Sequence, residues 1–266
     1  MSSDLEKLLY GTDKKIRTLQ LVINSRDRVD YGITTSSNFR VNLQNPINSK
    51  LIAYGLESVS IPKTNYNISS PMNVFEIEDS TGPKTITIPP GNYSASTFIA
   101  ELVAQLNASG DSYTVVKSSL TNKLTITSSF TGFIVNPDTE TYPLLIMMGF
   151  DDNTTYISVV GVLDAPNVMN ISGPTNLYIK IAQLTEYMRD TKNLSSNFKI
   201  DYGCEYGSNI YFSNQSKYLQ YYTTSQDHLQ RTEHFDIQLV DEAGNLVDLN
   251  GSNWSLVLRF VTKDLY

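Results

Sequence analysis

A strand, a turn and the start of a helix follow one another in Ile86-Thr87-Ile88-Pro89-Pro90-Gly91-Asn92-Tyr93-Ser94. Proline and glycine interrupt the strand, and the hydroxyl of Ser94 can cap the first free amides of a helix. The apolar residues that follow recur at helical spacing, which predicts one amphipathic helix. We expect three of them to lie in a hydrophobic core: Phe98, Leu102 and Leu106.

Two predicted strands follow this helix and complete a small αββ unit. Residues 113–116 and 124–127 have the composition of strands, and the turn Thr121-Asn122-Lys123 joins them. The segment closes with the apolar run Pro143-Leu144-Leu145-Ile146-Met147-Met148-Gly149-Phe150. Strand and turn patterns lie on both sides of it. We therefore expect an αββ unit inserted into a larger all-β body.

The C-terminal part of the chain has the pattern of the last hairpins of a β-sandwich. Residues 235–240 and 254–261 are predicted strands, with turn residues between them. Trp254 follows the turn Gly251-Ser252-Asn253 at the start of the second strand, and we expect its side chain in the core.

Length and composition bound the classes of protein to consider. The chain has 266 residues, 40% of them hydrophobic, and all-β sandwiches of this size commonly form one domain. A formal net charge of −7 argues against nucleic acid as a partner, because phosphate backbones attract clustered Lys and Arg. Cys204 is the only cysteine, which excludes an intrachain disulfide. The longest apolar run, Leu144 to Met148, is too short for a membrane span.

The N-terminal region differs from the rest of the chain in charge. Residues 1–15 are charged and poor in aromatic side chains, and we expect them to form a flexible arm. Residues 1–28 contain six basic and four acidic side chains, a slight excess that favours a solvated arm over a nucleic-acid-binding one. Four basic residues here are candidate interface residues: Lys14, Lys15, Arg26 and Arg28.

The usual motifs of catalytic and metal sites are missing from the sequence. His228 and His234 lie six residues apart in a polar stretch, which is not the spacing of a helical metal pair. The sequence has no phosphate-binding glycine loop, nucleophile elbow, zinc-protease motif or calcium loop. We expect no enzyme activity, no cofactor and no metal. A hydrolase with two catalytic carboxylates stays open as an alternative, because such residues converge only in the fold.

Six of the seventeen tyrosines lie between residues 201 and 222. Tyrosine offers a large, rigid contact surface with a polar tip, which protein interfaces and sugar-binding sites both use. One alternative is that these tyrosines only face the rim of the sandwich. Another is a carbohydrate- or receptor-binding β-sandwich that uses them as a stacking platform. The candidate interface residues in this segment are Tyr202, Tyr206, Tyr211, Tyr218, Tyr221 and Tyr222.

Several short motifs, in this order, resemble the penton proteins, or minor capsid proteins, of virophages, Polinton-like viruses and related large DNA viruses. Together they span most of the chain. They are Asn24-Ser25-Arg26-Asp27-Arg28, Phe39-Arg40-Val41-Asn42-Leu43, Ser58-Val59-Ser60-Ile61-Pro62, Tyr66-Asn67-Ile68, Ile88-Pro89-Pro90-Gly91-Asn92-Tyr93-Ser94, Met148-Gly149-Phe150 and Leu246-Val247-Asp248-Leu249-Asn250-Gly251-Ser252-Asn253-Trp254.

The resemblance implies a single jelly-roll sandwich that assembles as a homopentamer and plugs the fivefold vertices of an icosahedral capsid. Residues 16–83 and 151–266 would form the jelly-roll body, 84–150 the inserted αββ unit and 1–15 the arm. The implied partner is a double-jelly-roll major capsid protein, and the outer surface is a candidate for binding a host receptor or glycan. The implied location is the virion, at the capsid vertex, after assembly inside the host cell.

Overall fold

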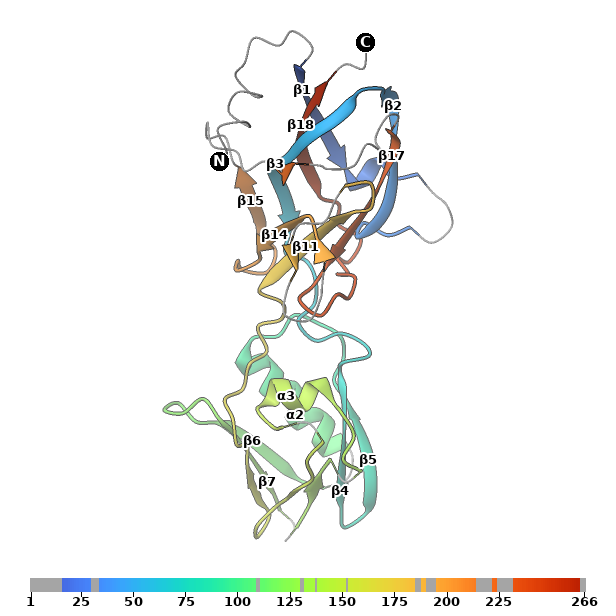
Figure 1. The fold of residues 1–266 in the computed structure, drawn as a ribbon. Helices are drawn as coiled ribbons and strands as arrows, with labels where there is room; N and C mark the ends of the chain where they lie inside the picture. The colour runs from blue at the N-terminus through green and yellow to red at the C-terminus, as the bar shows by residue number, and fades with distance from the viewer. Residues whose placement is uncertain are drawn as a thin grey trace. The chain divides into compact units, whose positions relative to one another are not determined.

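The chain forms two compact units in the computed structural model (Figure 1). The body unit contains Met1–Asn65 and Pro174–Tyr266, and the inserted unit contains Tyr66–Gly173. The expected N-terminal arm, residues 1–15, lies outside the residues that the structure describes. Those residues are 16–29, 34–108, 111–129, 132–136, 138–151, 153–184, 188–189, 195–213, 222–223 and 232–263.

The first sheet of the body unit contains strands from both the N-terminal and the C-terminal parts of the chain. Its strand order is β1 (Ile16–Asn24), β18 (Ser255–Lys263), β3 (Lys50–Pro62) and β15 (Asn209–Ser213). A short strand, β16 (Tyr222–Thr223), also pairs with β3. All of these pairings are antiparallel. Strands that are neighbours in this sheet are therefore far apart in the sequence.

The second sheet of the body unit is also antiparallel. Its order is β14 (Phe198–Asp201), β11 (Asn176–Ile181), β17 (Thr232–Val240) and β2 (Asn38–Ile47). The small elements of the body unit are the 3-10 turn η1 (Ser25–Asp27) and the pair β12 (Met188–Arg189) with β13 (Ser195–Ser196). The chain crosses between two antiparallel sheets from β1 to β2 to β3, and again from β17 to β18, which is jelly-roll topology. The expected all-β single jelly roll with an insertion is confirmed.

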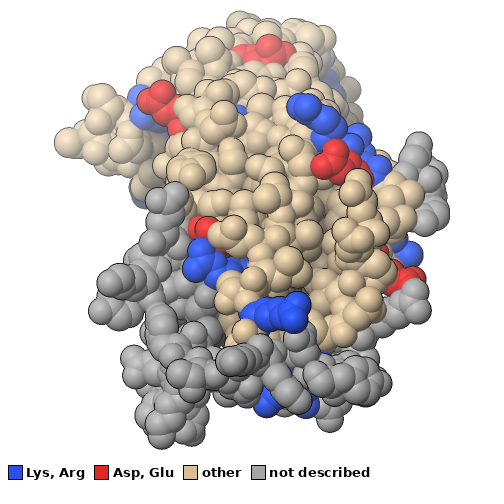
Figure 2. Space-filling view, turned by 90° about the horizontal axis from the view of Figure 1, so that it is seen from above, with Lys and Arg blue, Asp and Glu red and all other residues tan. Residues whose placement is uncertain are grey.

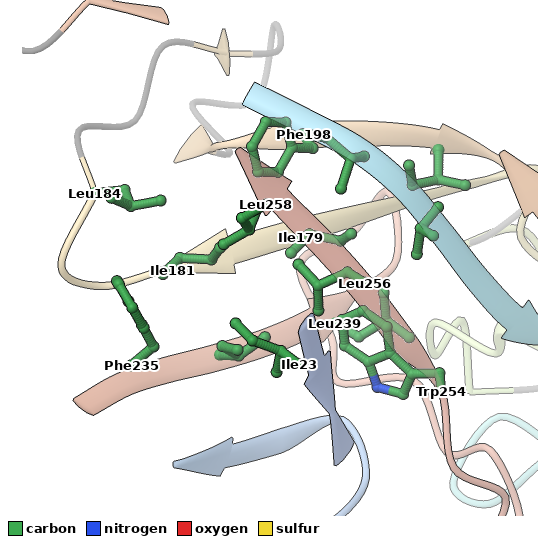
Figure 3. Packing of buried hydrophobic residues seen from close by; sticks show 14 of the residues in the cluster. Ile23, Ile179, Ile181, Leu184, Phe198, Phe235, Leu239, Trp254, Leu256 and Leu258 are labelled. Atoms are coloured by element: carbon green, nitrogen blue, oxygen red, sulfur yellow. The ribbon is translucent and has the colours of Figure 1, made fainter. Parts of the chain in front are cut away.

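One hydrophobic core fills the space between these two sheets. Residues alternate between buried and more exposed along β11, β14 and β18, as expected for strands with one face in a core. Figure 3 shows this packing for Ile179 and Ile181 of β11 and for Leu256 and Leu258 of β18. Trp254, only 2% exposed, enters the same core.

The inserted unit has its own sheets, helices and core. One sheet has the order β5 (Gly82–Thr87), β4 (Val74–Asp79), β8 (Ile134–Val135) and β9 (Tyr156–Ile157). The other has the order β10 (Val162–Asp164), β7 (Leu124–Ser128) and β6 (Tyr113–Lys117). Helix α2 (Ala95–Ala108) contacts β5 and β6, and helix α3 (Pro143–Met148) contacts β4. Phe98, Leu102 and Leu106 of α2 are fully buried in this core.

The inserted unit is wider than the expected 84–150. Strand β4 lies before that range, yet its residues Phe75 and Ile77 belong to the same core as α2. Beyond residue 150, β9 pairs with β8 and β10 pairs with β7. These pairings complete the two sheets, so the boundaries move to Tyr66 and Gly173.

The motif Met148-Gly149-Phe150 ends a helix that the sequence analysis did not predict. Gly149 is in the left-handed region, with φ of 95°, and its N–H donates to the carbonyl of Ile146 at 3.0 Å. A Cβ at this position would overlap the backbone carbonyl of Asn167. Glycine is required both for the helix end and for this close approach.

Candidate interaction surfaces

Two of the sequence motifs, Asn24 to Arg28 and Leu246 to Trp254, meet at one end of the first sheet of the body unit. Ser25 N donates to Trp254 O at 2.9 Å, and Trp254 N donates to Ser25 Oγ at 2.9 Å. Arg28 Nη1 donates to Ser25 O at 2.8 Å and to Asn253 Oδ1 at 2.9 Å. The indole of Trp254 donates from Nε1 to Ser36 O at 2.6 Å. These bonds attach the turn after β1 to the turn before β18.

The basic residues that were candidates for an interface have different roles in this arrangement. Arg28 is partly buried and uses its guanidinium for the internal bonds, so it has a structural role in the chain. Arg26 is exposed. Lys14 and Lys15 lie outside the described residues. Of these four, Arg26 is the one that the structure presents at the surface.

Tyr202 does not belong to an exposed interface, and that expectation was wrong. Its side chain is 0% exposed, and its hydroxyl donates to Pro62 O at 3.0 Å. Burial raises the pKa of this hydroxyl. The ring also lies beneath the ammonium of Lys63, at 5.2 Å from Nζ to the ring centroid. Tyr202 is a core residue with a satisfied hydroxyl.

Other aromatic residues of the same segment are exposed. Tyr206, Tyr211 and Phe212 are 44%, 68% and 41% exposed, and we call these three residues the aromatic edge. Tyr211 and Phe212 belong to β15, the last strand of its sheet in the described part of the chain. Tyr218 and Tyr221 lie outside the described residues, and Tyr222 is described only by its backbone pairing with Tyr54.

Acidic and basic side chains occur close together in the described part of the chain. Figure 2 shows blue and red residues lying beside each other at several places on the face it presents. On β2 and β17 the charges pair, with Arg40 Nε at 2.6 Å from Asp236 Oδ1. His234 Nε2 lies 3.6 Å from the other carboxylate oxygen of Asp236. These strands therefore carry a local pair of opposite charges.

The side chains that most often bind metal ions do not form a cluster in the described residues. Within the described ranges, no three His, Cys, Asp or Glu side chains come together as ligands for a metal ion. Cys204 is a free, partly exposed thiol, and His228 lies outside the described residues. No helix in the described part of the chain is long and apolar enough to cross a membrane.

The fold matches that of a solved penton protein over nearly the whole chain. A crystal structure of the mavirus penton protein has a TM-score of 0.50 and 13% sequence identity, and the match covers 92% of this chain and 99% of that one. A structure of the Sputnik virophage has a TM-score of 0.43 and 12% identity, covering 92% of this chain and 98% of that one. The match to the mavirus penton protein shows that the chain has a penton-like fold.

The family follows from a separate comparison. Residues 9–181 match the family described as "Family of unknown function (DUF5901)", and the chain belongs to that family. A comparison with curated protein sequences found no match.

Proposed function

We propose that this chain is a viral capsid protein, a penton that assembles as a homopentamer and plugs the fivefold vertices of an icosahedral capsid. The carrying observation is that the match to the mavirus penton covers 92% of this chain and 99% of the other. A match of that extent takes in the jelly roll and the inserted unit together. At 13% identity the likeness is one of fold, so the capsid role is the proposal that this fold supports.

The lateral contacts between subunits are proposed to involve the aromatic edge. A ring requires two different patches on each subunit that fit each other, because its contacts run head to tail. Exposed tyrosine and phenylalanine are the residue types that protein interfaces favour. Tyr211 and Phe212 lie on neighbouring positions of one edge strand, so both faces of that strand present an aromatic ring. Arg26 adds an exposed cation on the same unit.

The other parts of the proposal concern the surroundings of the ring. In the virion, the ring would contact a double-jelly-roll major capsid protein, after assembly inside the host cell. The inserted unit supplies a surface for contact or for display of a host-binding site. The arm, residues 1–15, is proposed to contact the capsid interior or a neighbouring subunit.

The mass of the purified protein tests the proposal. A ring of five copies has about five times the chain mass of 29.8 kDa, which light scattering after size exclusion measures directly. A monomer at every concentration examined, with and without the major capsid protein, would contradict the proposed pentamer.

A second candidate function has one observation in its favour. Tyr206 and Tyr211 are both exposed, and a tyrosine ring is a stacking surface for a sugar. In this alternative, the body unit is a carbohydrate- or receptor-binding sandwich. A glycan array separates the two candidates, because a vertex plug needs no sugar. Binding that Tyr211→Ala abolishes would favour the carbohydrate-binding function.

A further inference from the structure

A partly buried lysine and a buried aspartate lie in contact within the inserted unit. Lys84 Nζ is 2.5 Å from Asp79 Oδ2, and their side chains are 17% and 0% exposed. Asp79 is the last residue of β4, and Lys84 lies in the paired strand β5. The contact therefore closes the tip of the β4–β5 hairpin, inside a unit whose core is its own.

The two oxygens of Asp79 have different surroundings. Oδ1 accepts hydrogen bonds from Thr81 N at 2.9 Å and from Thr81 Oγ1 at 2.7 Å. Oδ2 accepts from Lys84 Nζ and from the hydroxyl of Tyr113, at 3.0 Å. Two fixed donors on one oxygen are the arrangement that stabilises negative charge developing on a carbonyl under attack. The amine lies on the side of the other oxygen.

A third side chain here is not explained by an ion pair. Asp111 is 4% exposed, and its Oδ2 is buried without a hydrogen-bond partner in the described residues. A buried polar atom without a partner destabilises the folded state, so it calls for a reason. Burial, together with a hydrogen bond to Asp79 and the charge of Asp79, raises the pKa of Asp111. The raised pKa favours the protonated form of Asp111 beside the pair.

We propose that Lys84 and Asp79 join in an intramolecular amide bond, with Asp111 relaying the proton that the reaction requires. This self-modification goes beyond the proposed capsid function and does not depend on it. An ion pair accounts for Lys84 and Asp79 but leaves Asp111 Oδ2 without a hydrogen-bond partner. The amide accounts for all three side chains and for the donors on Oδ1.

The reaction is a condensation that needs no other reagent. A proton passes from the Lys84 ammonium to Asp79 Oδ2, which leaves a neutral amine and a carboxylic acid. The amine attacks Cγ of Asp79, a C–N bond forms, and the charge on Oδ1 is held by the Thr81 donors. Asp111 gives its proton to Oδ2 and takes one from the nitrogen. The C–Oδ2 bond breaks, one water leaves, and Asp111 ends in its starting state.

The ionised pair is the starting state of this reaction. Burial opposes ionisation of Asp79, but hydrogen bonds from Lys84, Thr81 and Tyr113 hold the pKa of its carboxyl well below the ordinary value. The first proton transfer therefore runs uphill, and the reaction is expected to be slow. A freshly purified sample should convert with time, and the converted fraction should only rise.

Intact mass spectrometry of the full, denatured chain tests the proposal. The mature protein is expected to have the sequence mass minus one water molecule. A wild-type chain that keeps the full sequence mass after prolonged incubation overturns the proposal and leaves an ion pair only. This result is independent of oligomeric state, so it separates this proposal from the capsid function.

Digestion with trypsin identifies the residues from which the water molecule was lost. An unmodified chain gives the peptides Thr64–Lys84 and Thr85–Lys117, because trypsin cuts after Lys84. The amide blocks that cut, and the expected product is one peptide, Thr64–Lys117, lighter by one water. A mass loss with normal cleavage after Lys84 would identify a different dehydration, such as succinimide formation, and would overturn the proposed bond.

Three substitutions complete the test. Lys84→Met and Asp111→Asn are each expected to restore the full sequence mass, the first by removing the amine and the second by removing the proton relay. Lys123→Met is the matched control, because Lys123 Nζ also has an oxygen at 2.5 Å, but that oxygen is the backbone carbonyl of Pro166. Loss of water that persists in Lys84→Met contradicts the bond, and persistence in Asp111→Asn contradicts the relay.

Discussion

The guanidinium of Arg40 binds both carboxylate oxygens of Asp236, donating hydrogen bonds from Nε at 2.6 Å and from Nη2 at 2.8 Å. The two residues are register partners on β2 and β17. The hydrogen bonds from Arg40 lower the pKa of Asp236 from its ordinary value of 3.8, although partial burial opposes the change. Because the pKa is lower in the folded state, the stability from this pair is present above the unfolded pKa. It is lost as the pH falls through the folded pKa.

Asp236→Asn is expected to reduce the loss of stability in acid. The free energy of unfolding of the variant should change less than that of the wild type between about pH 4 and pH 2. Both side chains are about a third exposed, 37% and 35%, so the cost at neutral pH should stay below about 1 kcal/mol. Urea unfolding over a pH series measures both quantities.

The control for this prediction is Asp201→Asn. The side chain of Asp201 is 93% exposed, and its Oδ1 lies as far as 3.8 Å from Lys199 Nζ. Its removal should therefore leave the pH dependence of the free energy of unfolding unchanged. Equal acid slopes in the wild type and in Asp236→Asn would show that the Arg40 pair does not contribute.

Trp254→Ala is expected to destabilise the body unit by about 3–5 kcal/mol, because it leaves a large cavity in the core. Its ring contacts Phe39 edge to face, at 5.9 Å between centroids. Trp254→Phe keeps most of the apolar volume but loses the hydrogen bond to Ser36 O, and should cost less. Denaturant unfolding that gives equal midpoints for wild type and Trp254→Ala would contradict the core position.

Gly149→Ala is expected to destabilise the inserted unit. A non-glycine residue held at positive φ costs about 1–3 kcal/mol, and here the added Cβ also meets the carbonyl of Asn167. Hydrogen exchange, which resolves the two units, should show lost protection in α3. Gly132→Ala is the matched control, since nothing lies within 4 Å of its added Cβ. Equal effects of the two substitutions would be evidence against the close approach.

The aromatic edge gives a prediction about assembly. Replacing both Tyr211 and Phe212 by Ala should weaken self-association, because it removes the exposed rings of the proposed contact. The stability of the single chain should change by no more than about 0.5 kcal/mol for each surface substitution. Sedimentation velocity measures the association. Leu246→Ala, at a residue 47% exposed on the body unit, is the control and should associate as the wild type does.

Local patterns in the sequence predicted local structure well. The Ser94 cap is confirmed, since Thr97 N donates to Ser94 Oγ at 3.3 Å, and the buried face of α2 follows the helical spacing of its apolar residues. Helix α3 was missed because an apolar run of six residues fits a buried strand as well as a helix. Periodicity decides between helix and strand only when the segment is long enough to repeat.

Long-range pairing could not be predicted from the same patterns. Nothing near Ile23 specifies that it lies opposite Leu256, and nothing near Asp79 specifies that Asp111 lies beside it. The burial of Tyr202 did have a signal. Phe198, Ile200 and Tyr202 alternate along β14 and its continuation, and all three are buried. This period of two distinguishes Tyr202 from the exposed tyrosines that follow it in the same segment.

The pairing of β1 with β18 also determines the order in which the chain can fold. The inserted unit is continuous in sequence, so all its strand partners exist once residue 173 has been synthesised. The first sheet of the body unit has β18 between β1 and β3, and β18 comes later in the sequence than every other described strand of that sheet. Strand β1 must therefore wait for β18 before it pairs, whereas β3 can pair earlier with β15. A nascent chain would carry a folded inserted unit while its jelly roll is still incomplete. The unpaired strand edges of the jelly roll would then be exposed to incorrect pairing.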